Sequence, residues 1–138
     1  MENRYTKQAR EALDAAEVYA KELKHPYIGT EHLLMGLRTS ISGVAAQVLE
    51  MNGLREEDVR KVVGELVSRV GDEPFSGRPK ESPRLKFILE EGQKMAERFR
   101  MPEVGTEHLL LAIVRDTDCV AARILITLNI NLQKIMQD

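Results

Sequence analysis

The sequence of 138 residues is poor in cysteine and in aromatic residues: it contains one cysteine and no tryptophan, and aromatic residues make up 4% of it. The single cysteine, Cys119, excludes an internal disulfide and suits a reducing compartment. A hydrophobic core must therefore be built from aliphatic side chains. Hydrophobic residues make up 43% of the chain and charged residues 30%, which predicts a globular domain of ordinary size.

The sequence also lacks a basic excess, a long apolar run and an apolar leader segment. A net charge of −2 and a pI near 6.0 argue against a nucleic-acid partner, because phosphate contacts need positive charge. No stretch approaches the roughly 18 apolar residues that a membrane helix requires. We therefore expect a cytoplasmic protein with no nucleic-acid partner and no membrane partner.

Motifs for catalysis and for metal binding are missing as well. The chain has no Gly-x-x-x-x-Gly-Lys-Ser/Thr, Gly-x-Ser-x-Gly or His-Glu-x-x-His segment, and its three histidines and one cysteine form no zinc-binding pattern. We expect no catalytic residue, no metal and no cofactor. The alternative is an acid–base enzyme that uses Glu31 with His32 and Glu107 with His108. Adjacent helical positions diverge by about 100°, which disfavours one cleft for both side chains.

One six-residue phrase, Gly-Thr-Glu-His-Leu-Leu, occurs twice, each time after a β-branched apolar residue: Ile28-Gly-Thr-Glu-His-Leu-Leu34 and Val104-Gly-Thr-Glu-His-Leu-Leu110. The offset of 76 positions continues beyond the phrase, since it also aligns Pro26 with Pro102 and Leu49 with Leu125. The segment Val44-Ala-Ala46 likewise aligns with Val120-Ala-Ala122. The chain is therefore an internal duplication, which predicts two related sites on one body.

Helical periodicity dominates both copies. Apolar residues recur at three- and four-residue steps, and they predict helices over about 6–23, 30–38, 42–52, 59–70, 82–99, 106–115, 118–128 and 131–137. No stretch alternates with a period of two, so we expect no sheet. The predicted fold is all-α, with two pseudo-twofold-related four-helix repeats in one compact eight-helix domain. Repeat one covers about 4–70, a linker about 71–81, and repeat two about 82–138.

Several helix ends are marked by the sequence. Thr6 and Ser82 are placed as N-caps of the first helix in each repeat, and Thr30 and Thr106 as N-caps of the second. Gly53 and Asn129 follow the third helices, where a left-handed residue ends a helix well. His25-Pro26 and Met101-Pro102 end the first helices, because the residue before a proline avoids helical geometry.

The repeated Gly-Thr-Glu-His phrase has two interpretations. In the structural one, glycine makes a turn, threonine caps a helix, glutamate favours the helix dipole, and His32 and His108 pack between the repeats with one ring nitrogen hydrogen-bonded. In the binding one, each repeat offers a helix N-terminus for an anion and a carboxylate for a guanidinium. Such a site suits a ligand with both charges. The residues that would form it are Thr6, Arg4 and Glu31 in one repeat, and Ser82, Lys80 and Glu107 in the other.

Two copies of a helix followed by Gly-Thr-Glu-His-Leu-Leu, and then by Val-Ala-Ala with an aliphatic tail, resemble the Clp repeat domain. That domain forms the N-terminus of ClpA-, ClpB- and ClpC-type unfoldases, and the resemblance, to the ClpC type above all, covers about 4–136. It implies an all-helical domain that receives substrate and adaptor proteins for a hexameric AAA+ ring of the same chain or of a partner. It also implies recognition of proteins phosphorylated on arginine, through two equivalent pockets.

The resemblance implies roles for individual residues. Glu31 and Glu107 would bind the guanidinium, and the hydroxyls of Thr6 and Ser82 would face the phosphate. Ser82 stands where the family usually has threonine. Because Glu81 precedes Ser82, a carboxylate beside the second phosphate site would repel the ligand. We therefore expect the first pocket to bind more tightly than the second. A stand-alone Clp-repeat protein, acting as an adaptor or a competitor, is the alternative to an unfoldase domain.

Overall fold

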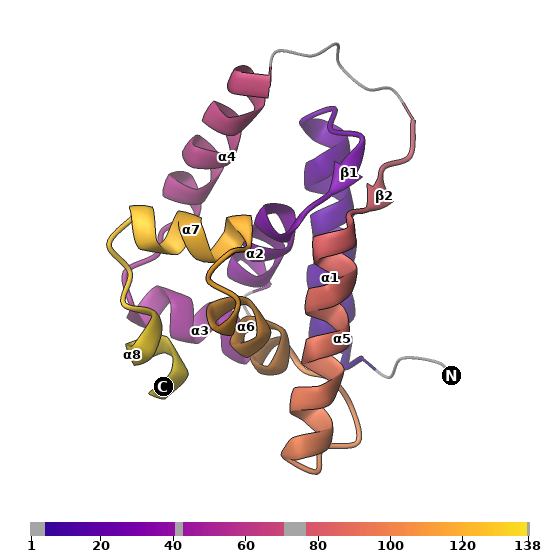
Figure 1. Ribbon diagram of the computed structural model, residues 1–138, viewed down its shortest axis with the longest axis vertical. Coiled ribbons are helices and arrows are strands. Elements are labelled where there is room, and N and C mark those ends of the chain that lie inside the picture. The colour runs from indigo at the N-terminus through magenta and orange to yellow at the C-terminus, as the bar shows by residue number, and fades with distance from the viewer. Residues whose placement is uncertain (1–4, 41–42, 71–76, 138) are drawn as a thin grey trace.

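The computed structural model describes residues 5–40, 43–70 and 77–137, with only the backbone described for residues 64–70. Within these ranges the chain forms eight helices, which confirms the all-α prediction (Figure 1). The bounds of the first three helices recur 76 positions later in α5, α6 and α7. The helices are α1 Lys7–Glu22, α2 Thr30–Thr39, α3 Val44–Met51, α4 Glu56–Val70, α5 Pro83–Arg98, α6 Thr106–Arg115, α7 Val120–Thr127 and α8 Leu132–Gln137.

The N-caps of the first helices are confirmed, and those of the second helices were predicted wrongly. Thr6 Oγ1 accepts the Ala9 N–H at 3.1 Å, and Ser82 Oγ accepts the Leu85 N–H at 3.1 Å. Helix α2, however, has Gly29 as its N-cap, and Thr30 is its first helical residue. The same shift by one residue occurs at α6, where Gly105 is the N-cap. The threonine hydroxyls therefore do not cap their own helices and can accept hydrogen bonds from other segments.

Left-handed residues end the first and third helices of both repeats. Gly53 and Asn129 have φ angles of 87° and 62°, as predicted. The sequence patterns did not indicate that Lys24 and Arg100 also adopt this conformation, with φ angles of 59° and 57°. Since α1 ends at Glu22 and α5 at Arg98, both helices have already ended before the prolines on which the prediction relied.

A small sheet corrects the expectation that the fold has none. Strand β1, Tyr27–Ile28, pairs in parallel with β2, Lys80–Glu81, and a single bridge joins Tyr5 to Val104. Two-residue strands are too short to show alternation, so sequence periodicity cannot reveal them. Strand β2 occupies the end of the predicted linker; residues 71–76 of that linker lie outside the described residues. The Tyr5–Val104 bridge joins one repeat to the other, and the β1–β2 pairing joins repeat one to the end of the linker, directly before repeat two.

Helices α2 and α6 occupy the middle of the fold, between α1 and α5 on one side and α3, α7 and α8 on the other (Figure 1). Each is buried almost all round, as a central helix requires. The buried apolar residues form one cluster that draws on both repeats. Val59 and Val63 of α4 join it as predicted; the side chains of Leu66, Val67 and Val70 lie outside the described residues, as does Ser42, where the third helix was expected to begin.

Gly36 lets α1 and α2 approach closely. A Cβ atom at this position would overlap the backbone carbonyl oxygen of Ala12, and a backbone atom cannot move aside without displacing its helix. Gly92, in the middle of α5, differs in this respect. A Cβ there would lie 2.8 Å from Leu109 Cδ2, which is the end of a flexible side chain.

Gly36→Ala should therefore destabilise the protein by about 2 kcal/mol, since overpacking a helix contact outweighs the helix propensity that alanine adds. The matched substitution Gly92→Ala should change the free energy of unfolding by less than about 1 kcal/mol, because Leu109 can change its rotamer. Urea unfolding followed by circular dichroism measures both. Equal effects of the two substitutions would contradict the proposed role of the Ala12 carbonyl.

Candidate functional site

The Gly-Thr-Glu-His turn depends on a glutamate that folds back over its own helix start. A Cβ atom on Gly29 would overlap the Glu31 carboxylate, and a Cβ on Gly105 would overlap that of Glu107 in the same way. Gly29 has φ −101° and ψ 179°, and Gly105 has φ −96° and ψ 173°, an extended conformation open to any residue. The glycines therefore leave room for the glutamate to fold back, whereas the turn itself does not require glycine as the sequence suggested.

The Glu31 carboxylate lies in a partly buried position at the start of α2. Burial raises its pKa, and a hydrogen bond with its own backbone N–H opposes that shift. The side chain is poorly hydrated, which makes an approaching cationic group a stronger partner than it would be at an open surface. Glu107 has the corresponding place at the start of α6.

His32 is 1% exposed and serves the turn rather than a ligand. Its Nδ1 accepts the Gly29 N–H at 2.8 Å, so its ring proton is on Nε2, which donates to His25 Nδ1 at 2.7 Å. Burial, and then the nearby His25, lower the pKa of His32 from its ordinary value of 6.5 to about 3. A neutral, fixed ring is therefore part of the folded state.

His108 repeats the first half of this arrangement. It is 3% exposed, and its Nδ1 accepts the Gly105 N–H at 2.8 Å. Its ring stacks against Phe99, with the ring centroids 6.3 Å apart. The burial of His32 and His108 with one nitrogen bonded confirms the histidine part of the structural interpretation, whereas its threonine caps were predicted wrongly. It also argues against the acid–base enzyme, because both His32 nitrogens are already engaged and Nδ1 of His108 is occupied.

Thr30 and Thr106 cap helices of the opposite repeat. The Ala121 N–H at the start of α7 donates to Thr30 Oγ1 at 3.1 Å, and the Ala45 N–H at the start of α3 donates to Thr106 Oγ1 at 3.1 Å. Ala45 and Ala121 are 76 positions apart, as are the two threonines. The exchange is thus reciprocal, and it confirms the pseudo-twofold relation between the repeats.

Cys119 and Gly43 occupy equivalent positions beside these caps. A Cβ on Gly43 would lie 2.9 Å from the Thr106 hydroxyl, so glycine leaves room for that hydroxyl. Cys119 is 1% exposed, and its Sγ accepts the Ala122 N–H at 3.4 Å. Burial raises the pKa of the Cys119 thiol, which keeps it protonated. Cys119 therefore packs in the core and caps the start of α7.

The predicted site residues come together across the repeats and not within them. The Ser82 N–H donates to Ile28 O at 3.0 Å, which places the start of α5 beside the turn that carries Glu31. The Thr6 N–H donates to Val104 O at 2.9 Å, which places the start of α1 beside the turn that carries Glu107. The pairing of Thr6 with Glu31 and of Ser82 with Glu107, expected from sequence, is therefore exchanged.

Charges near the two sites differ as a result. Lys80 and Glu81 form β2 directly before Ser82, and both side chains are exposed, so they accompany the Glu31 site. The equivalent position before Thr6 is Tyr5, which accompanies the Glu107 site. Arg4, the other predicted cationic residue, lies outside the described residues. Each site thus joins a hydroxyl-capped helix N-terminus to a carboxylate, and the Glu31 site carries an additional acid.

The Clp repeat (R) N-terminal domain model matches residues 4–135. The chain belongs to the Clp repeat N-terminal domain family. It is 39% identical, over 137 residues, to the negative regulator of genetic competence ClpC/MecB of Bacillus subtilis, and covers 17% of that protein. It is 38% identical, over 135 residues, to the ATP-dependent Clp protease ATP-binding subunit ClpC of Staphylococcus aureus, of which it spans 16%.

Solved structures of Clp repeat domains share the fold. The N-terminal domain of ClpD from Arabidopsis thaliana has a TM-score of 0.78 at 22% identity, with 97% of this chain and 93% of that chain covered. A ClpV N-domain in complex with a VipB peptide has a TM-score of 0.74 at 21% identity, with 96% and 82% covered. In this chain, no helix within the described ranges is both long and apolar enough to cross a membrane.

Thr106→Val should destabilise the Clp repeat fold by about 1–3 kcal/mol, because the buried Ala45 N–H loses its acceptor. Thr39→Val is the matched control. The Thr39 hydroxyl donates to the Met35 carbonyl of its own helix at 3.0 Å, so its loss should cost about 0.5 kcal/mol or less. Denaturant unfolding compares the two. If the Thr106→Val protein is as stable as the Thr39→Val protein, the hydrogen bond from Ala45 N–H to Thr106 does not contribute measurably to stability.

Acidification should destabilise the domain through His32. The unfolded histidine binds a proton near pH 6.5, whereas the folded one resists protonation down to about pH 3. The unfolded state therefore binds more protons in this window, and the free energy of unfolding should fall by about 1 kcal/mol per pH unit below 6.5. The lowered pKa of His25, caused by burial, acts in the same direction. Unfolding curves between pH 7 and 5.5 measure the slope. A His32 ring that titrates near pH 6.5 by NMR would contradict it.

Proposed function

We propose that this domain docks substrate and adaptor proteins for a Clp unfoldase without chemistry of its own, and that it recognises phosphoarginine on them. Its membership of the Clp repeat family supports the docking role. The relatives named above include an ATP-binding subunit of an ATP-dependent Clp protease, and the chain spans about a sixth of their length. In a cytoplasmic protein of this kind, the domain would present its cargo to an AAA+ ring.

The observation that carries the proposal is the pair of backbone hydrogen bonds between repeats, from Ser82 N–H to Ile28 O and from Thr6 N–H to Val104 O. Each bond holds a hydroxyl-capped helix N-terminus beside a turn that presents a glutamate. The helix N-terminus attracts a phosphate, and the carboxylate accepts two parallel hydrogen bonds from a guanidinium. Phosphoarginine has both groups joined by one P–N bond, which suits adjacent rather than distant partners.

A domain that shares this fold, the ClpV N-domain, has been solved in complex with a VipB peptide, and the likeness to it is one of fold alone. A stand-alone Clp-repeat protein that competes for the same ligands is the second candidate. The two differ in whether the reading frame continues past Asp138 into an ATPase module. Two sites on one domain, and several domains on one ring, would add avidity to weak single contacts.

The exchange of partners between repeats reverses the expected ranking of the two sites. From sequence, the Glu31 site was expected to bind more tightly, because Glu81 was assigned to the other one. The hydrogen bond from Ser82 N–H to Ile28 O supports a position of Ser82, and with it Glu81, beside the turn of Glu31. At the offset of 76, Lys80 corresponds to another cation, Arg4, whereas Glu81 corresponds to the uncharged Tyr5. The Glu81 carboxylate therefore distinguishes the two sites, and because it repels a phosphate we now expect the site of Thr6 and Glu107 to bind more tightly.

Calorimetric titration with free phosphoarginine tests both the function and the ranking. Glu107→Gln should weaken the tighter binding event by about tenfold or more, because a charge-assisted hydrogen bond is lost. Glu31→Gln should affect the weaker event, and the double variant should bind neither. Glu57→Gln is the matched control, since Glu57 also lies in the first turn of a helix and is exposed.

Absence of saturable binding, or a double variant that binds as the unmodified domain does, would refute the phosphoarginine proposal. A larger loss in Glu31→Gln than in Glu107→Gln would refute only the ranking.

A further inference from the structure

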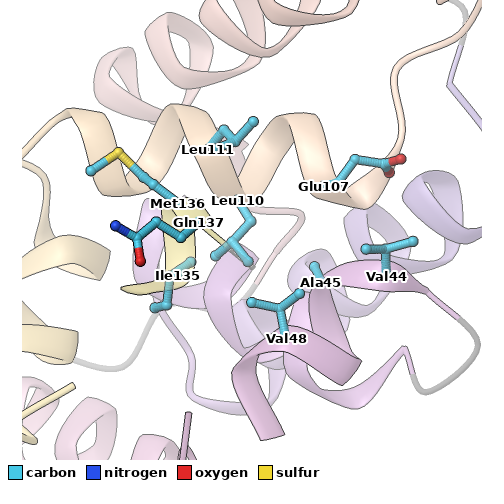
Figure 2. Close-up of a pocket in the computed structure, with 9 residues that line it drawn as sticks. All are labelled: Val44, Ala45, Val48, Glu107, Leu110, Leu111, Ile135, Met136 and Gln137. Carbon is cyan, nitrogen blue, oxygen red and sulfur yellow. The ribbon is translucent and has the colours of Figure 1, made fainter. Parts of the chain in front are cut away.

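A groove of about 170 Å³ runs between α3 and α6 and is closed at one end by α8. Figure 2 shows Glu107 at its other end, on the first turn of α6, above Val44 of α3. The side chains that give the groove its apolar character are Val44, Val48, Leu110, Leu111, Ile135 and Met136. Among the lining residues Glu107 is the one with a formal charge, so the groove is an apolar channel with a carboxylate at one end.

Two of these apolar side chains are largely open to solvent. Val44 is 46% exposed and Met136 is 43% exposed, although each lies beside buried neighbours. Burying them against another apolar group would be favourable by about 25 cal/mol per Å² of surface removed from water. Such surface next to a single charge indicates a partner that combines an apolar side chain with a cationic one.

The first repeat has different residues at the positions equivalent to this groove. The positions that correspond to Met136 and Gln137, 76 residues earlier, are Arg60 and Lys61 of α4. The Arg60 guanidinium lies 4.8 Å from the ring centroid of Tyr19, and its Nε is 3.2 Å from a Glu56 carboxylate oxygen. Two basic residues thus stand at the positions that correspond to the methionine and the glutamine, so we expect the two sites to select different residues around the bound arginine.

We propose that the groove binds the segment flanking a phosphoarginine in a partner protein, and that it prefers an aliphatic side chain two positions from that arginine. Glu107 and Leu111 are about one helical turn, roughly 6 Å, apart along α6. Side chains at alternate positions of an extended chain lie on one face and are about 6.6 Å apart. Both side chains then point towards α6, so an arginine whose guanidinium meets Glu107 places the end of its second neighbour near Leu111. The phosphorylated form of this ligand rests on the function proposed above.

Fluorescence anisotropy on the Glu31→Gln protein, which leaves the Glu107 site as the reporter, tests the preference. Three labelled peptides are compared: phosphoarginine with leucine two positions away on both sides, the same peptide with serine in place of leucine, and the leucine peptide with unmodified arginine. Free phosphoarginine is titrated as a competitor. The leucine phosphopeptide should bind about tenfold more tightly than the serine one.

Val44→Ser and Met136→Ser should each weaken binding of the leucine phosphopeptide more than binding of the serine phosphopeptide. The ratio of the two affinities should therefore approach one. Val120→Ser is the matched control, because Val120 is the equivalent of Val44 at the start of α7 and is 39% exposed. It should leave the ratio unchanged, and circular dichroism confirms that each variant is folded.

The outcomes separate the two proposals. Equal affinity for both phosphopeptides, with free phosphoarginine competing, would overturn the groove preference and keep phosphoarginine recognition. The groove preference would also be overturned if Val120→Ser lowers the affinity ratio of the leucine to the serine peptide as much as Val44→Ser does. The unmodified leucine peptide could also bind in a way that Met136→Ser weakens and free phosphoarginine does not compete with. That result would keep peptide binding in the groove and overturn phosphoarginine recognition. No binding of any peptide would overturn both.

Discussion

The hydrogen bonds that Thr30 and Thr106 accept from α7 and α3 determine how the two repeats fit together. Each satisfies a buried N–H group that has no partner in its own helix. Because the threonines are the first residues of α2 and α6, the bonds fix the starts of the two central helices against each other's repeat. The glutamates that follow are thereby placed within reach of the opposite repeat, where the first helices begin.

Most of the fold was predictable from the sequence because its signals are local. Apolar spacing located the helices, and Thr6, Ser82, Gly53 and Asn129 marked their ends through interactions within a few residues. The left-handed conformation of Lys24 was not predictable in the same way, since a lysine carries no preference for it. The two-residue strands were missed because they depend on contacts between segments that are distant in sequence.

The candidate residues of the site could be named from the sequence, and their role in binding stays a prediction; which of them are neighbours could not be predicted. The duplication drew attention to Glu31 and Glu107, and cap chemistry drew attention to Thr6 and Ser82. Which of them are neighbours depends on how two repeats dock, and a sequence offset of 76 is the same whether they pair within a repeat or across repeats. The groove beside Glu107 was missed for a related reason: α3, α6 and α8 contribute to it from three separate parts of the chain.

Partners exchanged between repeats have a consequence for the origin of the chain. In a single repeat, the threonine hydroxyl at the start of the second helix would have no N–H group to accept from. The turn that carries the glutamate would have no helix N-terminus beside it. Two copies of that repeat, related by a twofold axis, would supply each other with both, since an isologous contact is satisfied twice. The present chain is thus organised as a homodimer joined by a covalent connection. Its two halves nevertheless differ at equivalent positions, such as Gly43 and Cys119 or Arg60 and Met136.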